Sequence, residues 1–227
     1  MSVYYAGPNP PDAVELRVLG ALIEKRRTTP DAYPLSVNSL RLACNQSTNR
    51  DPVVDYDEHT VLDALERLGR RGWTRLASGA GSRARKYRHL FAEALDLADD
   101  EVALLAILML RGPQTPGELK QRADRLHGFT DLAAVHGGLD RLIDRELATA
   151  LARRPGQKEQ RYAQLLDGGE LEDAATAVPA PFADSATHAP SAAPPADAAL
   201  VERVDNLERE VAELTAQLAA LRAELGP

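Results

Sequence analysis

The sequence predicts a mainly α-helical protein that carries small β-hairpins. Apolar residues recur with helical spacing in several segments, short β-type segments flank glycine-containing turns, and one apolar pattern occurs twice. The 227 residues are 44% hydrophobic and 27% charged, which is typical of globular proteins that bury a core.

An internal repeat organises the first 166 residues. Four apolar residues recur 74 positions later: Val61, Leu65, Leu68 and Trp73 correspond to Val135, Leu139, Leu142 and Leu147. One position further along, Tyr87 and Leu90 correspond to Tyr162 and Leu165. We therefore expect two copies of one unit, a first domain of residues 1–92 and a second domain of residues 93–167.

Each copy is expected to contain three helices. The first helices are predicted over residues 14–24 and 101–110, and the third helices over residues 57–71 and 130–145. Ser36 is the expected N-cap of the second helix in copy one. In copy two, Thr115 and Glu118 have the spacing of a capping box, with Pro116 at the first helical position.

A β-hairpin is expected to close each copy. In copy one, residues 73–76 and 86–90 flank the turn Gly79-Ala80-Gly81, and in copy two Pro155-Gly156 lies in the turn of residues 151–162. Three helices followed by a hairpin form a winged helix, a helix-turn-helix with a β-wing. The expected architecture is therefore two tandem winged-helix domains.

Several long stretches are specific enough to indicate a family. They are TTPDAYPLSVN (28–38), ACNQ (43–46), NRDPV (49–53), LRGPQTPGEL (110–119) and RPGQKEQRY (154–162). On these stretches, the chain resembles the YceH-like family of bacterial proteins over about residues 15–166. The resemblance implies tandem winged helices but no particular activity. Ser47-Thr48 replaces the Lys-Ser usual in this family, which weakens a phosphate-binding role for that loop, and Gln164 stands where members often have His.

The hairpins carry most of the signal for a ligand. The first hairpin, residues 74–90, has five cations and no acidic residue, whereas the second has four cations and one acid, Glu159. Wings often lie against nucleic-acid phosphates, where each cation adds salt-dependent affinity. The candidate contacts are Arg75, Arg83, Arg85, Lys86, Arg88, Arg153, Arg154, Lys158 and Arg161, together with Arg50 from the polar loop of residues 45–50. The alternative is that these are ordinary solvated cations.

The charges at the starts of the predicted third helices argue against recognition of base sequence by these helices. Asp55, Asp57 and Glu58 precede or begin the first of them, and Asp131 begins the second. Carboxylates there suit the helix dipole and repel phosphate.

The C-terminal quarter differs from the rest in composition. Residues 168–199 form an Ala- and Pro-rich stretch that reads as a flexible linker. Residues 200–227 then present a heptad seam, which predicts a parallel coiled-coil dimer or a helix that folds back on its own chain. The seam consists of Leu200, Val204, Leu207, Val211, Leu214, Leu218, Leu221 and Leu225. Residues 167–227 hold 12 acidic side chains against three arginines. The negative formal net charge of −7 therefore comes from this tail, and residues 1–166 have a slight excess of basic side chains.

Signals for catalysis, metals and membranes are weak. Cys44 is the only cysteine and is expected to be buried, the five histidines lack metal-ligand spacing, and the glycines of residues 112–117 lack the Lys of a phosphate loop. We therefore expect a cytoplasmic, non-enzymatic protein without a cofactor or a membrane segment. Its expected role is regulatory or architectural nucleic-acid binding, with double-stranded DNA as a candidate ligand and a C-terminal homodimer. The alternative is an adaptor whose winged-helix faces bind another protein.

Overall fold

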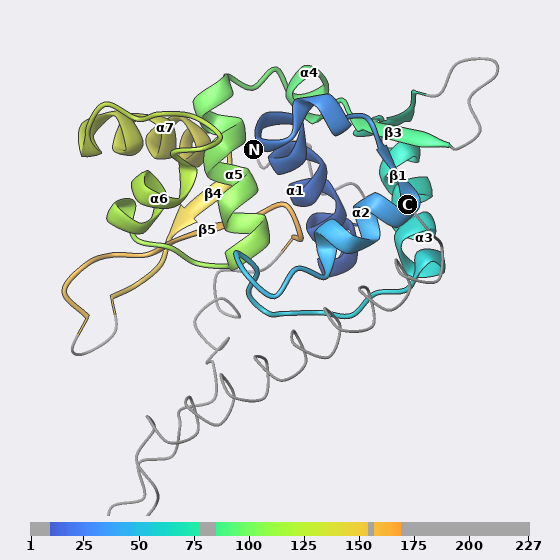
Figure 1. Ribbon diagram of the computed structural model, residues 1–227. Helices are drawn as coiled ribbons and strands as arrows, with labels where there is room; N and C mark the ends of the chain where they lie inside the picture. Colours follow the sequence, from blue (N-terminus) through green and yellow to red (C-terminus); the bar gives the residue numbers. More distant parts are fainter. Residues whose placement is uncertain (1–9, 78–84, 154–156, 169–227) are drawn as a thin grey trace, which may run out of the picture. The chain divides into compact units, whose positions relative to one another are not determined.

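A computed structural model describes residues 10–77, 85–153 and 157–168 (Figure 1). All of these residues belong to one compact unit. The fold is mainly helical with two small antiparallel sheets, as the sequence predicts.

The chain passes through two similar successions of elements. The first half contains α1 (Ala13–Thr28), the 3₁₀ turn η1 (Pro30–Ala32), β1 (Leu35–Ser36), α2 (Val37–Cys44), α3 (Glu58–Arg70), β2 (Thr74–Leu76), β3 (Lys86–His89) and α4 (Phe91–Leu95). The second half contains α5 (Asp99–Arg111), α6 (Pro116–Ala123), α7 (Leu132–Asp144), β4 (Ala148–Ala150) and β5 (Tyr162–Gln164).

The predicted helix starts are confirmed. Ser36 Oγ accepts a hydrogen bond from the backbone N of Ser39 at 3.2 Å, which caps α2. Thr115 and Glu118 form the reciprocal bonds of a capping box at 3.2 and 2.9 Å, with Pro116 in the first helical position. These bonds satisfy backbone donors that have no partner within the helix.

The two sheets have related pairings. In the first half, the strand order is β1-β3-β2, with Leu35 opposite Tyr87 and Arg75 opposite Arg88. In the second half, β4 pairs with β5, and an isolated bridge joins Gln114 to Tyr162. This bridge corresponds to the pairing of β1 with β3. In each half, the backbone just before the second helix pairs with the second strand of the hairpin.

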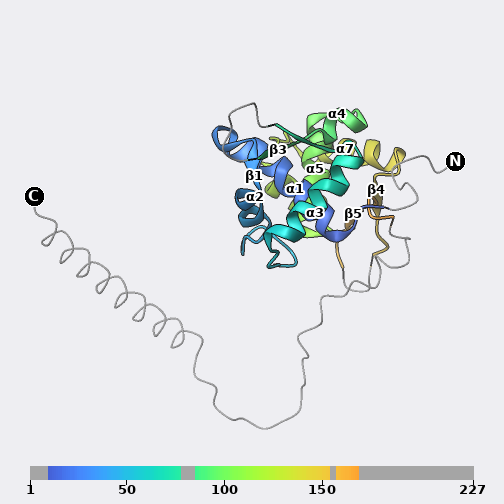
Figure 2. The ribbon, with the colours of Figure 1, turned by 90° about the vertical axis from the view of Figure 1, so that its right-hand side faces the viewer.

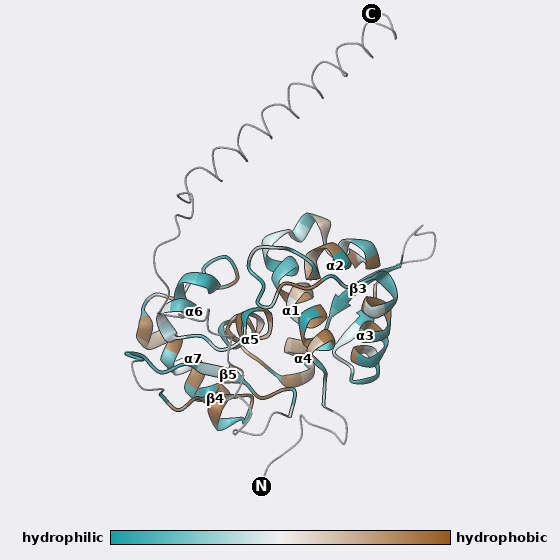
Figure 3. Ribbon diagram, turned by 90° about the horizontal axis from the view of Figure 1, so that it is seen from below, coloured by the Kyte–Doolittle hydropathy of each residue, from teal (hydrophilic) through white to brown (hydrophobic). Residues whose placement is uncertain are grey.

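α1 and α5 form the centre of the molecule (Figures 1 and 3). Nearly every residue in the middle of both helices is buried, and the buried residues of the two halves form one hydrophobic cluster. The sequence predicts an apolar face on these helices, but the other face is also covered because the helices pack on each other. Figure 2 looks onto the first half, with α2 and α3 on its outer side.

Candidate nucleic-acid interface

The outward face of the first sheet gathers cations. Side chains alternate along a strand, so Lys86 and Arg88 of β3 share one face. Arg75 stands opposite Arg88, and Ser36 stands opposite Lys86, which places all four on that face. Arg75 and Lys86 are exposed, and Arg88 is half-buried. We call Arg75, Lys86 and Arg88 the wing cations.

Within the described part of the chain, the wing cations have no carboxylate partner. Among the described residues, none of the three forms an ion pair. Like charges directly opposite each other on antiparallel strands destabilise the pair, as Arg75 and Arg88 do here. Arg85, just before β3, adds another exposed cation. An external anion would relieve this repulsion.

The inward face of the same sheet anchors it to the core. Leu35, Thr74 and His89 are buried on this face. Thr74 Oγ1 donates to the carbonyl of Leu65 at 3.1 Å, and the backbone N of His89 donates to Tyr33 Oη at 2.7 Å. Burial lowers the pKa of His89 to about 4, so this ring is neutral at pH 7. The charge of the sheet therefore lies on its outward face.

The exposed side of α3 is acidic. Glu58, Asp63 and Glu66 are exposed along it. Asp57 caps the helix by accepting a 2.7 Å bond from the backbone N of Thr60, and this bond lowers the pKa of the Asp57 carboxyl. The helix thus presents carboxylates where a groove-reading helix would present donors or cations.

Two arginines at the C-terminal end of α3, Arg67 within the helix and Arg71 as its C-cap, are held by a buried glutamate of α1. Glu15 is 2% exposed, and its carboxylate lies 3.2 Å from Arg67 Nε and 3.2 Å from Arg71 Nε. Arg67 also pairs with Asp12 at 2.8 Å. These cations hold α1 and α3 together and are not free for a phosphate.

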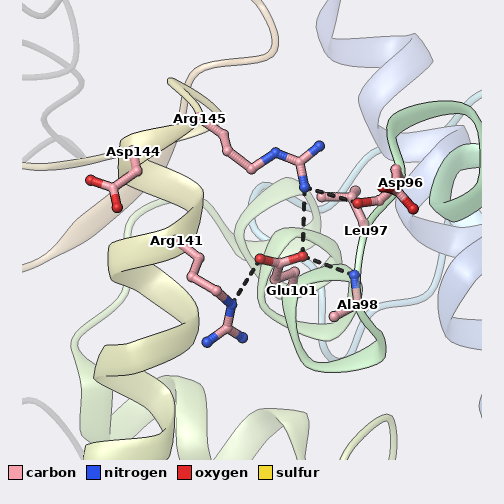
Figure 4. Close-up of a pocket in the computed structure, with 7 residues that line it drawn as sticks. All are labelled: Asp96, Leu97, Ala98, Glu101, Arg141, Asp144 and Arg145. Carbon is pink, nitrogen blue, oxygen red and sulfur yellow. Dashed lines mark hydrogen bonds and ion pairs between the residues drawn. The ribbon is translucent and has the colours of Figure 1, made fainter.

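The second half repeats this cluster (Figure 4). Arg141 Nε donates to Glu101 Oε1 at 3.0 Å, and Arg145 Nη1 lies 3.7 Å from Glu101 Oε2. The same Glu101 oxygen accepts a bond from the backbone N of Ala98 at 2.8 Å. The shallow hollow of about 560 Å³ beside these residues is therefore lined by a structural ion-pair cluster.

Sequence reasoning missed these two clusters, although a signal was present. Arg67 and Arg71 correspond to Arg141 and Arg145 at the 74-residue spacing that defines the apolar repeat. Extending the repeat from apolar to charged positions would have found the arginines. It would not have found their glutamates, because Glu15 and Glu101 lie in a segment that repeats with another spacing.

Arg50 is a correction to the predicted set of phosphate contacts. Its side chain is 0% exposed, and Nη2 lies 2.6 Å from Glu24 Oε2 while Nη1 lies 3.1 Å from Oε1. Nε and Nη2 also donate to the carbonyl of Ala43 at 3.1 and 2.8 Å. This buried arginine holds the loop after α2 against α1 and cannot reach an external ligand.

Among its described residues, the second hairpin offers fewer free cations than the first. Arg153 and Lys158 are exposed. Arg161 Nη1 donates to the carbonyl of Pro113 at 2.8 Å and lies 3.4 Å from Glu118 Oε2, which partly neutralises it. Of the two hairpins, the first therefore has more exposed cations without an ion-pair partner among the described residues.

Several predicted residues lie outside the described part of the chain. They are Arg83 and Arg154 in the hairpins, nearly all of the linker of residues 168–199, and the whole heptad seam from Leu200 to Leu225.

Cys44 is buried, as expected. Burial raises the pKa of its thiol to about 12, so it is not a thiolate at neutral pH. Within the described ranges, His, Cys, Asp and Glu side chains form no cluster suited to a metal ion. No helix in those same ranges has the length and apolar character needed to cross a membrane.

Together, the fold and the site define a class of mainly helical proteins with two similar halves and a cationic sheet face on the first. The chain belongs to the family described as "Protein of unknown function, DUF480", which matches residues 12–157.

Curated relatives extend this match to nearly the whole chain. A UPF0502 protein of Enterobacter sp. (strain 638) is 43% identical over 94% of this chain and 97% of its own length. A UPF0502 protein of Pectobacterium atrosepticum is 45% identical over 93% of this chain and 98% of its own. The UPF0502 protein YceH of Salmonella paratyphi B is 44% identical over 94% of this chain and 97% of its own length. The predicted membership in the YceH-like family is thus confirmed.

Proposed function

We propose that this chain is a non-enzymatic nucleic-acid-binding protein built from two winged-helix units, with a regulatory or architectural role. Each half runs helix, short strand or bridge, helix, helix, and then two paired strands, which is the order of a winged helix. In this interpretation, α3 and α7 are the third helices, and β2-β3 and β4-β5 are the wings.

The observation that carries the proposal is the unpaired charge of the first wing. Arg75, Lys86 and Arg88 share one outward face without a carboxylate partner among the described residues, and Arg75 and Arg88 face each other. Phosphates of a duplex would neutralise these cations and release counterions, which provides affinity without base recognition.

The mode of binding follows from the contrast between the wing and α3. Because the exposed side of α3 carries Glu58, Asp63 and Glu66, its insertion into a major groove would bring carboxylates against phosphates. We therefore expect contact through the wing, with little dependence on base sequence.

Binding of a duplex DNA probe at several salt concentrations tests the proposal. Replacing Arg75 and Arg88 by Gln should weaken binding about tenfold or more at ~50 mM salt, and reduce the slope of log K against log salt by about 2. Arg70→Gln is a control outside the wing, because it removes one exposed cation of α3 and should change the affinity less than threefold.

Two results would contradict the proposal. One is undetectable binding of the full chain at ~50 mM salt, and the other is a larger loss for Arg70→Gln than for the wing variant. The latter result would show that α3, and not the wing, meets the nucleic acid.

A protein-binding adaptor is the second candidate function. Leu42 of α2 and Val53 of the following loop are 56% and 58% exposed. The neighbouring helix α3 carries acidic side chains on its exposed side. Such a surface suits a protein partner better than a polyanion. An adaptor would retain its partner in a pull-down with the Arg75 and Arg88 variant, whereas a nucleic-acid binder would lose its ligand.

A further inference from the structure

A second cationic site lies away from the wing, in a cleft of about 740 Å³. Its walls come from the last turn of α1, the loop after α2, the end of α5, and α6 with the residues that follow it. We call this space the polar cleft. Its volume is in the range of pockets that hold small molecules.

The cleft has a preformed wall in the loop after α2. Asn49 has a φ of 61°, a left-handed conformation that is uncommon for residues other than glycine. Its carbonyl accepts a 2.8 Å bond from the buried Arg50, and its side-chain Oδ1 accepts from Arg111. The backbone N of Asp51 donates to the carbonyl of Leu110 at 2.9 Å, which ties the same loop to α5. These contacts hold the wall in place without a ligand.

Positive charge exceeds negative charge in the lining. The cations are Lys25, Arg111, Arg122 and Arg125, and the acids are Glu24 and Asp124. Glu24 is already bound by both terminal nitrogens of Arg50. Arg122 has Glu118 at 3.5 Å, but that carboxylate is shared with Arg161 at 3.4 Å. Arg125 is exposed and forms no ion pair with any described residue.

Arg111 lies close to other arginine side chains. The pKa of Arg111 is lowered, first by its partial burial and then by the nearby charges of Arg122 and Arg50. Arg111 and Arg122 are therefore close enough to repel each other, although Glu24 and Asp51 act on Arg111 in the opposite direction, and an anion between the two arginines would reduce their repulsion.

From this geometry we propose that the polar cleft binds a small anion carrying two or more phosphate groups. Guanidinium groups match phosphate oxygens with paired hydrogen bonds, and Arg111 and Arg122 come from different helices, so cations reach the cleft from more than one wall and can each take a phosphate group. The hydroxyl of Thr48 supplies a further donor at the rim. None of the described residues that line the cleft is aromatic and able to stack on a base, so recognition rests on the phosphates.

Binding there would connect the two halves. α1 and the loop bearing Asn49 belong to the first half, whereas α5 and α6 belong to the second. A ligand held by both sides should stabilise the folded chain by an amount that grows with the logarithm of the ligand concentration above its Kd.

Thermal unfolding and calorimetry of the full chain test this proposal, with pyrophosphate and tripolyphosphate as probes at ~150 mM salt. We expect saturable binding and a rise in Tm of about 5 °C near saturation. Replacing Arg122 and Arg125 by Gln should weaken pyrophosphate binding at least tenfold. Arg125→Gln alone should weaken it at least threefold, and provides the test if the double variant does not fold.

The wing variant, with Arg75 and Arg88 replaced by Gln, is the matched control. It removes the same number of arginines and should keep pyrophosphate affinity within twofold while losing duplex binding. The absence of saturable binding at millimolar probe, or an equal loss in the wing and cleft variants, would overturn the cleft proposal. Neither result bears on wing binding, which is measured with duplex DNA.

Discussion

His89 illustrates how burial determines charge at single positions. Its ring is buried next to Tyr33, with the two ring centroids 6.3 Å apart, and neither ring nitrogen has a hydrogen-bond partner in the structure. Burial without a partner disfavours the protonated form, which is why the pKa of His89 falls from 6.5 to about 4.

This depressed pKa predicts a loss of stability in acid. Above about pH 6.5, His89 is neutral in both folded and unfolded chains and has no pH-dependent effect. As the pH falls from about 6.5 to about 4, the unfolded chain binds a proton that the folded chain does not, so the free energy of unfolding decreases. Between pH 7.5 and 4.5, the decrease attributable to His89 should be about 2–3 kcal/mol.

Denaturant unfolding of His89→Phe at these two pH values checks the prediction. The substitution keeps a ring in the core and removes the titrating group. Between pH 7.5 and 4.5, the free energy of unfolding of the variant should therefore decrease by about 2–3 kcal/mol less than that of the wild type. His59→Asn is the control, because His59 is exposed and pairs only with Asp63 on the surface among the described residues, so the acid sensitivity attributed to His89 should remain. Equal acid sensitivity of wild type and His89→Phe would contradict the assignment.

At the scale of elements, the contact between α1 and α5 depends on a small residue. A Cβ placed on Gly20 would lie 2.9 Å from Leu110 Cγ and 3.4 Å from Met109 Cβ. These atoms are in the buried part of α5 and have little room to move. Gly20 therefore allows the two central helices to approach closely, at the expense of its own low helix propensity.

Gly20→Ala should destabilise the protein by about 1–3 kcal/mol, since overpacking exceeds the gain in helix propensity. Gly69→Ala in α3 is the matched control. Its added Cβ would have Thr74 Oγ1 at 3.8 Å as nearest neighbour, so it should stabilise the protein by about 0.5–1 kcal/mol. Both values follow from denaturant unfolding at neutral pH. A Gly20→Ala variant as stable as the wild type would show that α5 can shift away.

At the scale of the whole molecule, the sequence predicts that two chains join through the seam of residues 200–227. In solution, the full-length protein should form a dimer with twice the mass of one chain, and a variant that ends at Ala199 should be monomeric. Mass measurement at micromolar concentration decides this, and a monomeric full chain would contradict the seam. Joining two chains would place two first-half wings in one assembly, which raises avidity for a long polyanion.

The sequence alone determined the elements of this protein and its family. Helical periodicity, the Ser36 and Thr115 caps and the glycine-rich turn are local signals, and local signals can be read without neighbours. They predicted the helices and hairpins within a few residues, but β1, which has only two residues, and α4 left no recognisable pattern. The predicted boundary between residues 92 and 93 falls inside α4.

Tertiary structure alone decided which charges are available. Arg50 and Arg75 are both arginines in polar segments, yet the first is enclosed by Glu24 and backbone carbonyls while the second is exposed on a sheet. Their difference depends on partners distant in sequence, as does the enclosure of α1 by α5. Burial and ion pairing arise only when segments meet in space, so a one-dimensional pattern can indicate a cation but not its partner.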